Sequence, residues 1–305
     1  MILSDNETKV DMLNNRAIAK TVADVIRECD NRPISIGVHG DWGAGKSSIL
    51  AMVEDDLKSK TTDKNNNVVC IRFNGWQHQG FEDAKIALMS AIVSELSKNE
   101  KFSKKAEETF KKLWKNINWL SVAKAAGSAV FSLSTGLPPI GLMNNLMDGL
   151  KSTVSDTDKV NSLIDSIGKY MTDSKVFEDV SLNKEFSEFQ SSFATLLKKT
   201  KIEKLVVLID DLDRCLPKVT IETLEAVRLF MFVDSTAFVI AADEAMIEYA
   251  VNEHFPNLPE STDSDKYDYS KRYLEKLIQV PFKIPALGEI ESEIYIHGLY
   301  IMWLQ

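Results

Sequence analysis

The sequence predicts an α/β fold in which helices cover both faces of a doubly wound parallel sheet. Several short runs of Val, Ile and Leu are apolar throughout, which is typical of strands buried on both faces. Amphipathic helical patterns alternate with these runs, as in βαβ units. A glycine-rich stretch also joins the first apolar run to a helical pattern, at the place where such sheets bind ligands.

Five strands are expected, each a mostly apolar run of residues. They are Ile34–Val38, Val68–Phe73, Leu205–Ile209, Ala237–Ala242 and Leu277–Phe282. Helices are expected where apolar residues recur at a spacing of three or four. These segments are Val10–Glu28, Ser47–Leu57, Asp83–Leu96, Lys101–Leu113, Lys159–Met171 and Phe186–Leu197.

Composition narrows the function classes. The 305 residues carry a net charge of −9, whereas a general nucleic-acid binder needs a basic face. The three cysteines, Cys29, Cys70 and Cys215, lack zinc-site spacing and are expected to be reduced thiols. The N-terminus shows no signal-peptide pattern, so we expect a cytoplasmic protein.

One segment leaves membrane association open. Residues 125–147 carry no charge, and the segment is long enough to cross a bilayer. It is interrupted by glycines and by Pro138-Pro139, and a spanning helix tolerates such a break poorly. We therefore expect two short helices, buried or interfacial, with a turn at Leu137–Pro139, and we disfavour membrane insertion.

The glycine-rich stretch fits the phosphate-binding loop G-x-x-x-x-G-K-[ST] at every position. Its glycines let successive backbone N–H groups point inward, and the following helix N-terminus adds its dipole. Lys46 is expected to reach the β- and γ-phosphates of ATP, and the Ser47 hydroxyl to bind Mg²⁺. Trp42 is expected to pack against the loop rather than stack on the base. The predicted nucleotide contacts are Gly40, Asp41, Trp42, Gly43, Ala44, Gly45, Lys46, Ser47, Ser48 and, from the first helix, Arg16.

Acidic residues follow the most apolar strand. Asp210 is the candidate Walker B ligand of Mg²⁺ through water, and Asp211 is placed to orient the attacking water. The alternative for Asp210 is a cap on the next helix. Asp213 and Arg214 either form an ion pair that fixes the loop or take part in catalysis.

Two further polar residues follow strands. Asp243 is a candidate sensor of the γ-phosphate or, equally, a cap on the helix Ala245–Val251. Asn74 is a second sensor candidate.

These segments together resemble the KAP family of P-loop NTPases. The resemblance rests on GDWGAGKS at 40–47, FNGW at 73–76, LIDDLDRC at 208–215, FVIAAD at 238–243 and YLEKLIQVPFKIP at 273–285. Gly75 stands where the family usually has Ala. The resemblance implies an ASCE-type sheet of strand order 5-1-4-3-2, with an insertion between the Walker motifs. The family includes phage-exclusion and defence proteins and animal membrane scaffolds.

The expected organisation follows from these motifs. Residues 1–97 and 189–288 form the two parts of the NTPase core, and residues 98–188 form a helical insertion. Residues 289–305 begin a C-terminal helical region, expected to be truncated here.

The leading functional hypothesis is an ATPase that drives a conformational switch in a homo-oligomer or a complex with other protein subunits. The alternative is a nucleotide-bound scaffold that hydrolyses slowly. A GTPase is disfavoured because the sequence lacks N-K-x-D. Arg272 is the candidate arginine finger, acting on a neighbouring subunit, with Arg214 as the competitor acting in cis. The alternative for Arg272 is a surface ion pair with Asp268 or Glu275.

Overall fold

The computed structural model describes residues 11, 13–59, 67–78, 83–127, 182–255, 269–286, 288 and 293. By internal contacts the chain divides into two units. The first comprises Met1–Glu95 and Leu197–Gln305, and the second comprises Leu96–Leu196.

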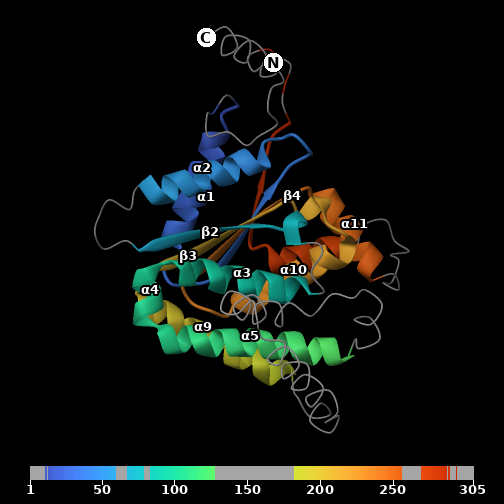
Figure 1. Ribbon diagram of the computed structural model, residues 1–305. Helices are drawn as coiled ribbons and strands as arrows, with labels where there is room; N and C mark the ends of the chain where they lie inside the picture. The colour runs from blue at the N-terminus through green and yellow to red at the C-terminus, as the bar shows by residue number, and fades with distance from the viewer. Residues whose placement is uncertain are drawn as a thin grey trace, which may run out of the picture. The chain divides into compact units, whose positions relative to one another are not determined.

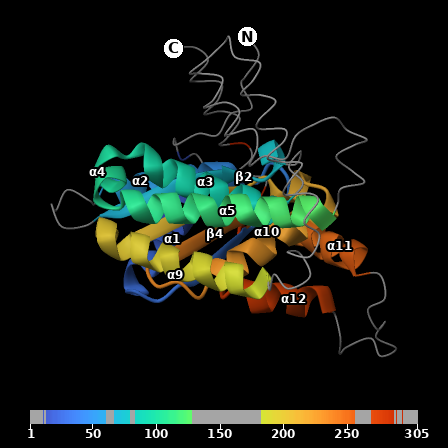
Figure 2. The same ribbon diagram turned by 60° about the horizontal axis from the view of Figure 1, so that its bottom comes forward.

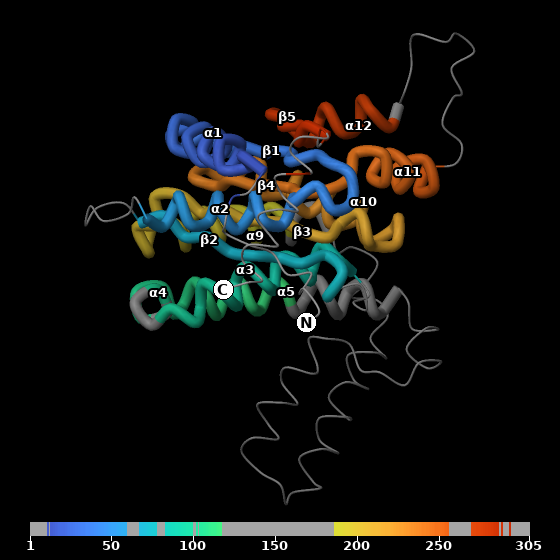
Figure 3. The backbone as a smooth tube through the Cα atoms, turned by 90° about the horizontal axis from the view of Figure 1, so that it is seen from above, coloured from blue at the N-terminus to red at the C-terminus, as the bar shows by residue number. Residues whose placement is uncertain are grey.

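The first unit is built on a five-stranded parallel sheet of order β2-β3-β4-β1-β5. Figure 3 shows the strands following one another in this order. Read from the other edge it is 5-1-4-3-2, so the predicted fold class and strand order are confirmed. The strands are β1 (Ile34–His39), β2 (Val68–Asn74), β3 (Lys204–Asp210), β4 (Thr236–Ala242) and β5 (Val280–Lys283).

The last strand begins later than predicted. Leu277 ends the helix α12 (Tyr269–Leu277), and the Ile278 N–H still donates to the Leu274 carbonyl at 2.8 Å. The backbone turns at Gln279, whose N–H donates to the Ser35 carbonyl of β1 at 3.0 Å. The predicted strand Leu277–Phe282 therefore merged the buried end of a helix with an edge strand.

Helices α1 (Asn15–Glu28) and α2 (Lys46–Ser59) cover one face of the sheet (Figure 1). Their apolar residues pack on alternate residues of the three central strands. Arg27 joins the two helices by donating at 2.7 Å to a carboxylate oxygen of Asp56.

Helix α10 (Pro217–Phe230) comes after β3, α11 (Glu244–His254) comes after β4, and α12 precedes β5. Helix α11 lies between α10 and α12 (Figures 2 and 3). The rings of Phe230 on α10 and Phe238 on β4 have centroids 5.8 Å apart, which places α10 on the face opposite α1 and α2. Helix α3 (Ala84–Lys98) is tied to α10 by an ion pair between Lys85 and Glu225.

The second unit contains α4 (Glu100–Lys105), α5 (Glu107–Gly127) and most of α9 (Leu182–Thr200). The single helix predicted over Lys101–Leu113 is in fact two helices that meet at Ala106. On α9 the rings of Phe189 and Phe193 stack with centroids 5.8 Å apart. The predicted helix Lys159–Met171 and the uncharged segment after Gly127 lie outside the described residues. Among the helices that the structure describes, none is both long and apolar enough to cross a bilayer.

Candidate functional site

The carboxyl ends of four neighbouring strands bring the candidate residues to one edge of the sheet. The loop 40–47 follows β1, Asn74 ends β2, Asp210 ends β3 and Asp243 follows β4. Asn74 pairs in register with Asp210. Parallel strands all end at the same edge, so residues distant in the sequence meet here.

The loop is shaped by two glycines with positive φ. Gly43 has φ 81° and Gly45 has φ 86°, a conformation that glycine adopts without steric cost. A Cβ on Gly45 would also lie 2.9 Å from the side-chain nitrogen Nδ2 of Asn15, a buried residue at the start of α1. Sequence reasoning missed Asn15, because its position beside the loop depends on how α1 packs on α2.

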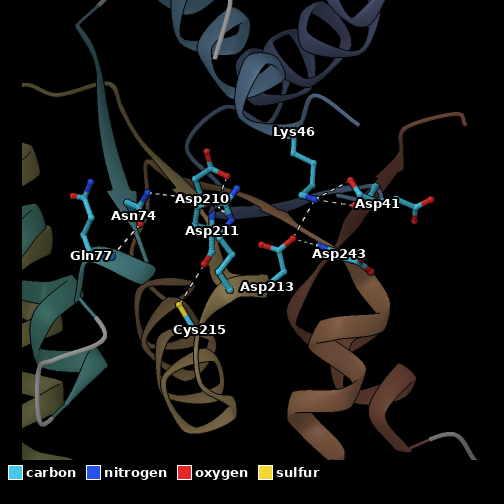
Figure 4. A network of polar contacts seen from close by, with 11 residues as sticks. Asp41, Lys46, Asn74, Gln77, Asp210, Asp211, Asp213, Cys215 and Asp243 are labelled. Carbon is cyan, nitrogen blue, oxygen red and sulfur yellow. Dashed lines mark hydrogen bonds and ion pairs between the residues drawn. The ribbon is translucent and has the colours of Figure 1, made fainter. Parts of the chain in front are cut away.

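The Lys46 side chain is 9% exposed, and acceptors surround its ammonium group. Its Nζ donates to the carbonyls of Gly40 at 2.9 Å and Asp41 at 3.1 Å. It also lies 3.1 Å from Oδ2 of Asp213, whose side chain is 12% exposed (Figure 4). Asp213 therefore pairs with Lys46, and the suggested ion pair between Asp213 and Arg214 is wrong.

Both carboxylate oxygens of Asp211 are engaged. Nδ2 of Asn74 donates to Oδ2 at 2.7 Å (Figure 4). Nε of Arg214 lies 3.1 Å from Oδ1. Asp211 also has φ 57°, in the left-handed region, where Asp and Asn are several-fold enriched among non-glycine residues. The sharp turn after β3 thus aims this carboxylate along the sheet edge toward β2.

Asp210 faces the start of α2. Its carboxylate is hydrogen-bonded to Ser47, and its Oδ1 accepts the Asp211 N–H at 2.9 Å. Burial raises the pKa of Asp210 above its ordinary value, and the neighbouring charges of Asp211 and Asp213 raise it further, whereas the Ser47 hydrogen bond lowers it. The alternative role as a helix cap does not apply, because α10 is preceded by Leu216 and has no side-chain cap.

Trp42 departs from the expectation that it packs against the loop. Its side chain is 81% exposed, and the Arg214 guanidinium lies 5.6 Å from its ring centroid. The tip of the loop projects into solvent because Gly43 turns the chain there, with no atom near its Cβ position.

Asp243 takes the capping role that was one of its two alternatives. Its Oδ1 accepts the Ala245 N–H at 2.9 Å and so caps α11. Its own N–H donates to Oδ2 of Asp213 at 3.2 Å. Asp213 therefore connects the lysine of the loop to the start of α11.

Gly75, where the resemblance leads us to expect alanine, has a local explanation. A Cβ at this position would lie 2.7 Å from a methyl carbon of the buried Leu212 and 3.1 Å from Sγ of Cys215. Leu212 begins the short 3₁₀ helix η2 (Leu212–Arg214). Glycine therefore lets β2 end directly against the turn that carries Asp211.

His39 is buried beneath the loop at the end of β1. It is 5% exposed, and its Nδ1 has no hydrogen-bond partner among the residues that the structure describes. Burial lowers the pKa of His39 below its ordinary value, although the nearby Glu244 opposes this shift. A Cβ on Gly37 would collide with this ring, so β1 needs glycine there.

Two predicted arginines lie away from these contacts. The side chain of Arg16 is 60% exposed and lies 3.6 Å from Asp55 of α2, while the adjacent Asn15 approaches the loop. Arg272 is on the exposed side of α12. Contacts of Lys46, Asp211 and Asp213 within the described residues do not include either arginine.

The donor set suits a hard, small cation. A hydroxyl and one carboxylate, Ser47 and Asp210, meet directly. Among the described residues no group of three or more His, Cys, Asp or Glu side chains is arranged to hold a metal. Mg²⁺ keeps several waters and takes one or two protein ligands together with substrate phosphates, so this sparse set fits it.

Comparisons with known proteins agree with the sequence motifs. A family model described as the KAP family P-loop domain matches residues 15–298. The phage T7 exclusion protein of Escherichia coli K12 is 26% identical over 250 residues, which cover 82% of this chain and 30% of that protein. An uncharacterized protein of Methanocaldococcus jannaschii is 26% identical over 178 residues, covering 54% of this chain and 85% of its own length. This chain thus spans less than a third of the Escherichia coli relative.

One solved structure is similar in outline. The Aeropyrum pernix ORC2 protein, described as ADPNP-ADP complexes, aligns with 96% of this chain and 53% of its own at 10% identity. Its TM-score of 0.45 is too low to carry any argument about function.

Proposed function

Because the chain belongs to the KAP family of P-loop NTPases, we propose that it binds ATP together with Mg²⁺ and hydrolyses it. One observation carries this proposal. Lys46, Ser47, Asp210 and Asp211 meet at one sheet edge, with Lys46 buried and Ser47 bonded to Asp210. Cation, hydroxyl and carboxylates are the groups that phosphoryl transfer needs within a few ångströms.

The loop supplies the phosphate contacts. The positive φ of Gly43 and Gly45 curls the backbone, and α2 begins at Lys46, so its N-terminal N–H groups favour an anion. The Lys46 ammonium would bind the β- and γ-phosphates. It has three donor hydrogens, and its present acceptors in the loop are two carbonyls.

Charge supports a divalent cation. Within the described part of the chain, Asp213 forms an ion pair with Lys46 and Asp211 forms one with Arg214, so with Asp210 three carboxylates face the two cations of these pairs. A triphosphate added to this edge would meet an excess of negative charge. Ser47 and Asp210 would hold Mg²⁺, which would offset the negative charge of the phosphates.

Asp211 would orient the attacking water. The αL turn and the bond from Asn74 fix its carboxylate. Proton acceptance requires one of its oxygens to be available within hydrogen-bond reach of the water. Arg214 is half-exposed and is the more readily displaced partner, so we propose that Oδ1 serves the water.

The same contacts favour a second candidate, a nucleotide-bound scaffold that hydrolyses slowly. With Asn74 and Arg214 both in place, each oxygen of Asp211 already has a donor, which leaves fewer lone pairs for the attacking water. In this case ATP stays bound until a partner displaces Arg214. Measured turnover distinguishes the two candidates, because the scaffold binds Mg-ATP with turnover far below the typical enzyme range of about 1–10³ s⁻¹.

The test combines binding and turnover. Calorimetry with Mg-ATP should give saturable binding by the parent protein, and Lys46→Ala should abolish it or weaken it severely. The Lys46 side chain is 9% exposed, so truncation to alanine could disturb the packing. Lys46→Met is the control for this effect, because it keeps a buried side chain of similar length and removes the charge. Unchanged affinity of both variants would overturn the loop assignment. ATPase turnover is then measured at several protein concentrations, with GTP as the competing substrate.

We further propose that hydrolysis drives a conformational switch in a multi-subunit assembly with a role in antiviral defence. Similarity to a phage exclusion protein supports the role, and this chain spans 30% of that protein. Residues 98–188 are proposed as a helical insertion within the NTPase core. Plaque counts of phage on cells with and without the gene, and with Lys46→Ala, test the role directly.

A further inference from the structure

Asp213 links two parts of the site through a single oxygen. Its Oδ2 lies 3.1 Å from Nζ of Lys46 and accepts the Asp243 N–H at 3.2 Å. Asp213 comes from η2 after β3, Lys46 from the loop after β1, and Asp243 from the end of β4, the strand between them. Figure 4 shows the three side by side.

This arrangement has a consequence for the nucleotide. A buried ammonium without a counter-charge is costly, and Asp213 supplies the charge within the described contacts of Lys46. The phosphate oxygens of a nucleotide would bind the same Lys46 ammonium. Asp213 and the phosphates are also both negatively charged and repel each other. Competition for Lys46 and this repulsion should both lower the affinity for the nucleotide.

We propose that Asp213 competes with the nucleotide for Lys46, and that nucleotide binding thereby alters the hydrogen bonds at the start of α11. This inference rests on the proposed function. When Lys46 turns to the phosphates, Asp213 loses its cation and faces negative charge. It then turns away from Asp243, whose N–H loses its acceptor. Asp243 caps α11 through Ala245, so the start of α11 responds to the occupancy of the loop.

The first experiment measures ATP affinity by calorimetry in EDTA, so that any contact of Asp213 with a metal is absent. Asp213→Asn keeps an oxygen that can accept the Asp243 N–H and removes only the charge. A charged hydrogen bond of typical strength corresponds to binding that is about 10–100-fold tighter once the competitor is gone. Asp234→Asn removes the same charge from an exposed residue that precedes β4, at the opposite sheet edge, and should leave the affinity unchanged.

The second experiment uses the parent protein and needs no variant. Amide hydrogen exchange over 243–247 is followed with and without ATP. Ligand binding usually slows exchange near a site, whereas loss of the Asp213 acceptor should speed exchange at the Asp243 amide. The acceleration should be smaller in Asp213→Asn, because the competing charge is absent before ATP is added.

The outcomes distinguish a failure of the proposed function from a failure of the competition between Asp213 and the nucleotide. If the parent protein binds no ATP, with or without Mg²⁺, the proposed function fails and the inference fails with it. If the parent binds ATP and Asp213→Asn binds it no more tightly, only the competition is refuted. Unchanged or slower exchange at Asp243 in the parent refutes the link to α11.

Discussion

Replacing Asp211 by asparagine tests the assignment of the water-orienting group with little disturbance of the fold. The change substitutes one carboxylate oxygen by an amide nitrogen. The amide side chain can still accept the hydrogen bond from Asn74, at present 2.7 Å, through its remaining oxygen. It loses the ion pair with Arg214, whose side chain is 45% exposed, and half-exposed pairs of this kind contribute about 1 kcal/mol or less.

The effect on hydrolysis should be much larger. An amide cannot accept the proton of the attacking water, and a positioned general base contributes about 10²–10⁴ in rate. That range corresponds to about 3–5 kcal/mol in the activation free energy. The chemical effect therefore exceeds the stability effect several-fold, and the two can be separated.

The assay is single-turnover hydrolysis of bound ATP, with affinity and melting temperature measured in parallel. Asp211→Asn should bind Mg-ATP about as tightly as the parent, melt within a few degrees of it and cleave ATP at least about 10²-fold more slowly. Asp234→Asn, exposed and at the other sheet edge, should match the parent in all three measurements. Cleavage by Asp211→Asn at the parent rate would mean that the base lies elsewhere.

Three further changes probe other parts of the molecule. Lys204→Met should lower the free energy of unfolding by about 2 kcal/mol in denaturant titrations, because the Nζ of the buried Lys204 donates to the carbonyls of Asp30 and Arg32 in the turn after α1. An unchanged free energy of unfolding would show that these hydrogen bonds make no net contribution to stability. His39 has a lowered pKa, so the unfolded state binds more protons and stability should fall as pH drops through about 6.5, the ordinary value; His39→Gln should flatten this slope, and an equal slope in parent and variant would contradict the reasoning. Arg272→Ala should lower turnover and, mixed with Lys46→Ala, recover part of it if the finger acts between subunits; normal turnover of Arg272→Ala at every protein concentration excludes that role.

The sheet could be predicted because its central strands are buried on both faces and largely apolar. The residues of β1 and β4 are all buried, although β1 includes the polar Ser35 and His39. The end of α12 was misassigned for the same reason. Leu277 and Ile278 are buried like strand residues, and a short apolar run does not distinguish a helix end from a strand.

The sequence could not predict which charged residues after β3 form ion pairs with each other. Asp213 and Arg214 are neighbours in the chain, but η2 is a 3₁₀ helix, in which residues three apart eclipse one another. Arg214 therefore lies over Asp211, and Asp213 points elsewhere, to Lys46. Asn15 could not be found either, because its place beside Gly45 follows from the packing of α1 against α2.

The order of the strands explains why these groups can act on one another. β4 lies between β1, which carries the loop, and β3, which carries the aspartates. Asp213 must reach across the end of β4 to meet Lys46, and in doing so it accepts the Asp243 N–H. We therefore propose that a change at the loop 40–47 acts first on β4 and on α11, the helix that follows it. A partner protein whose binding depends on the nucleotide should be sought at α11.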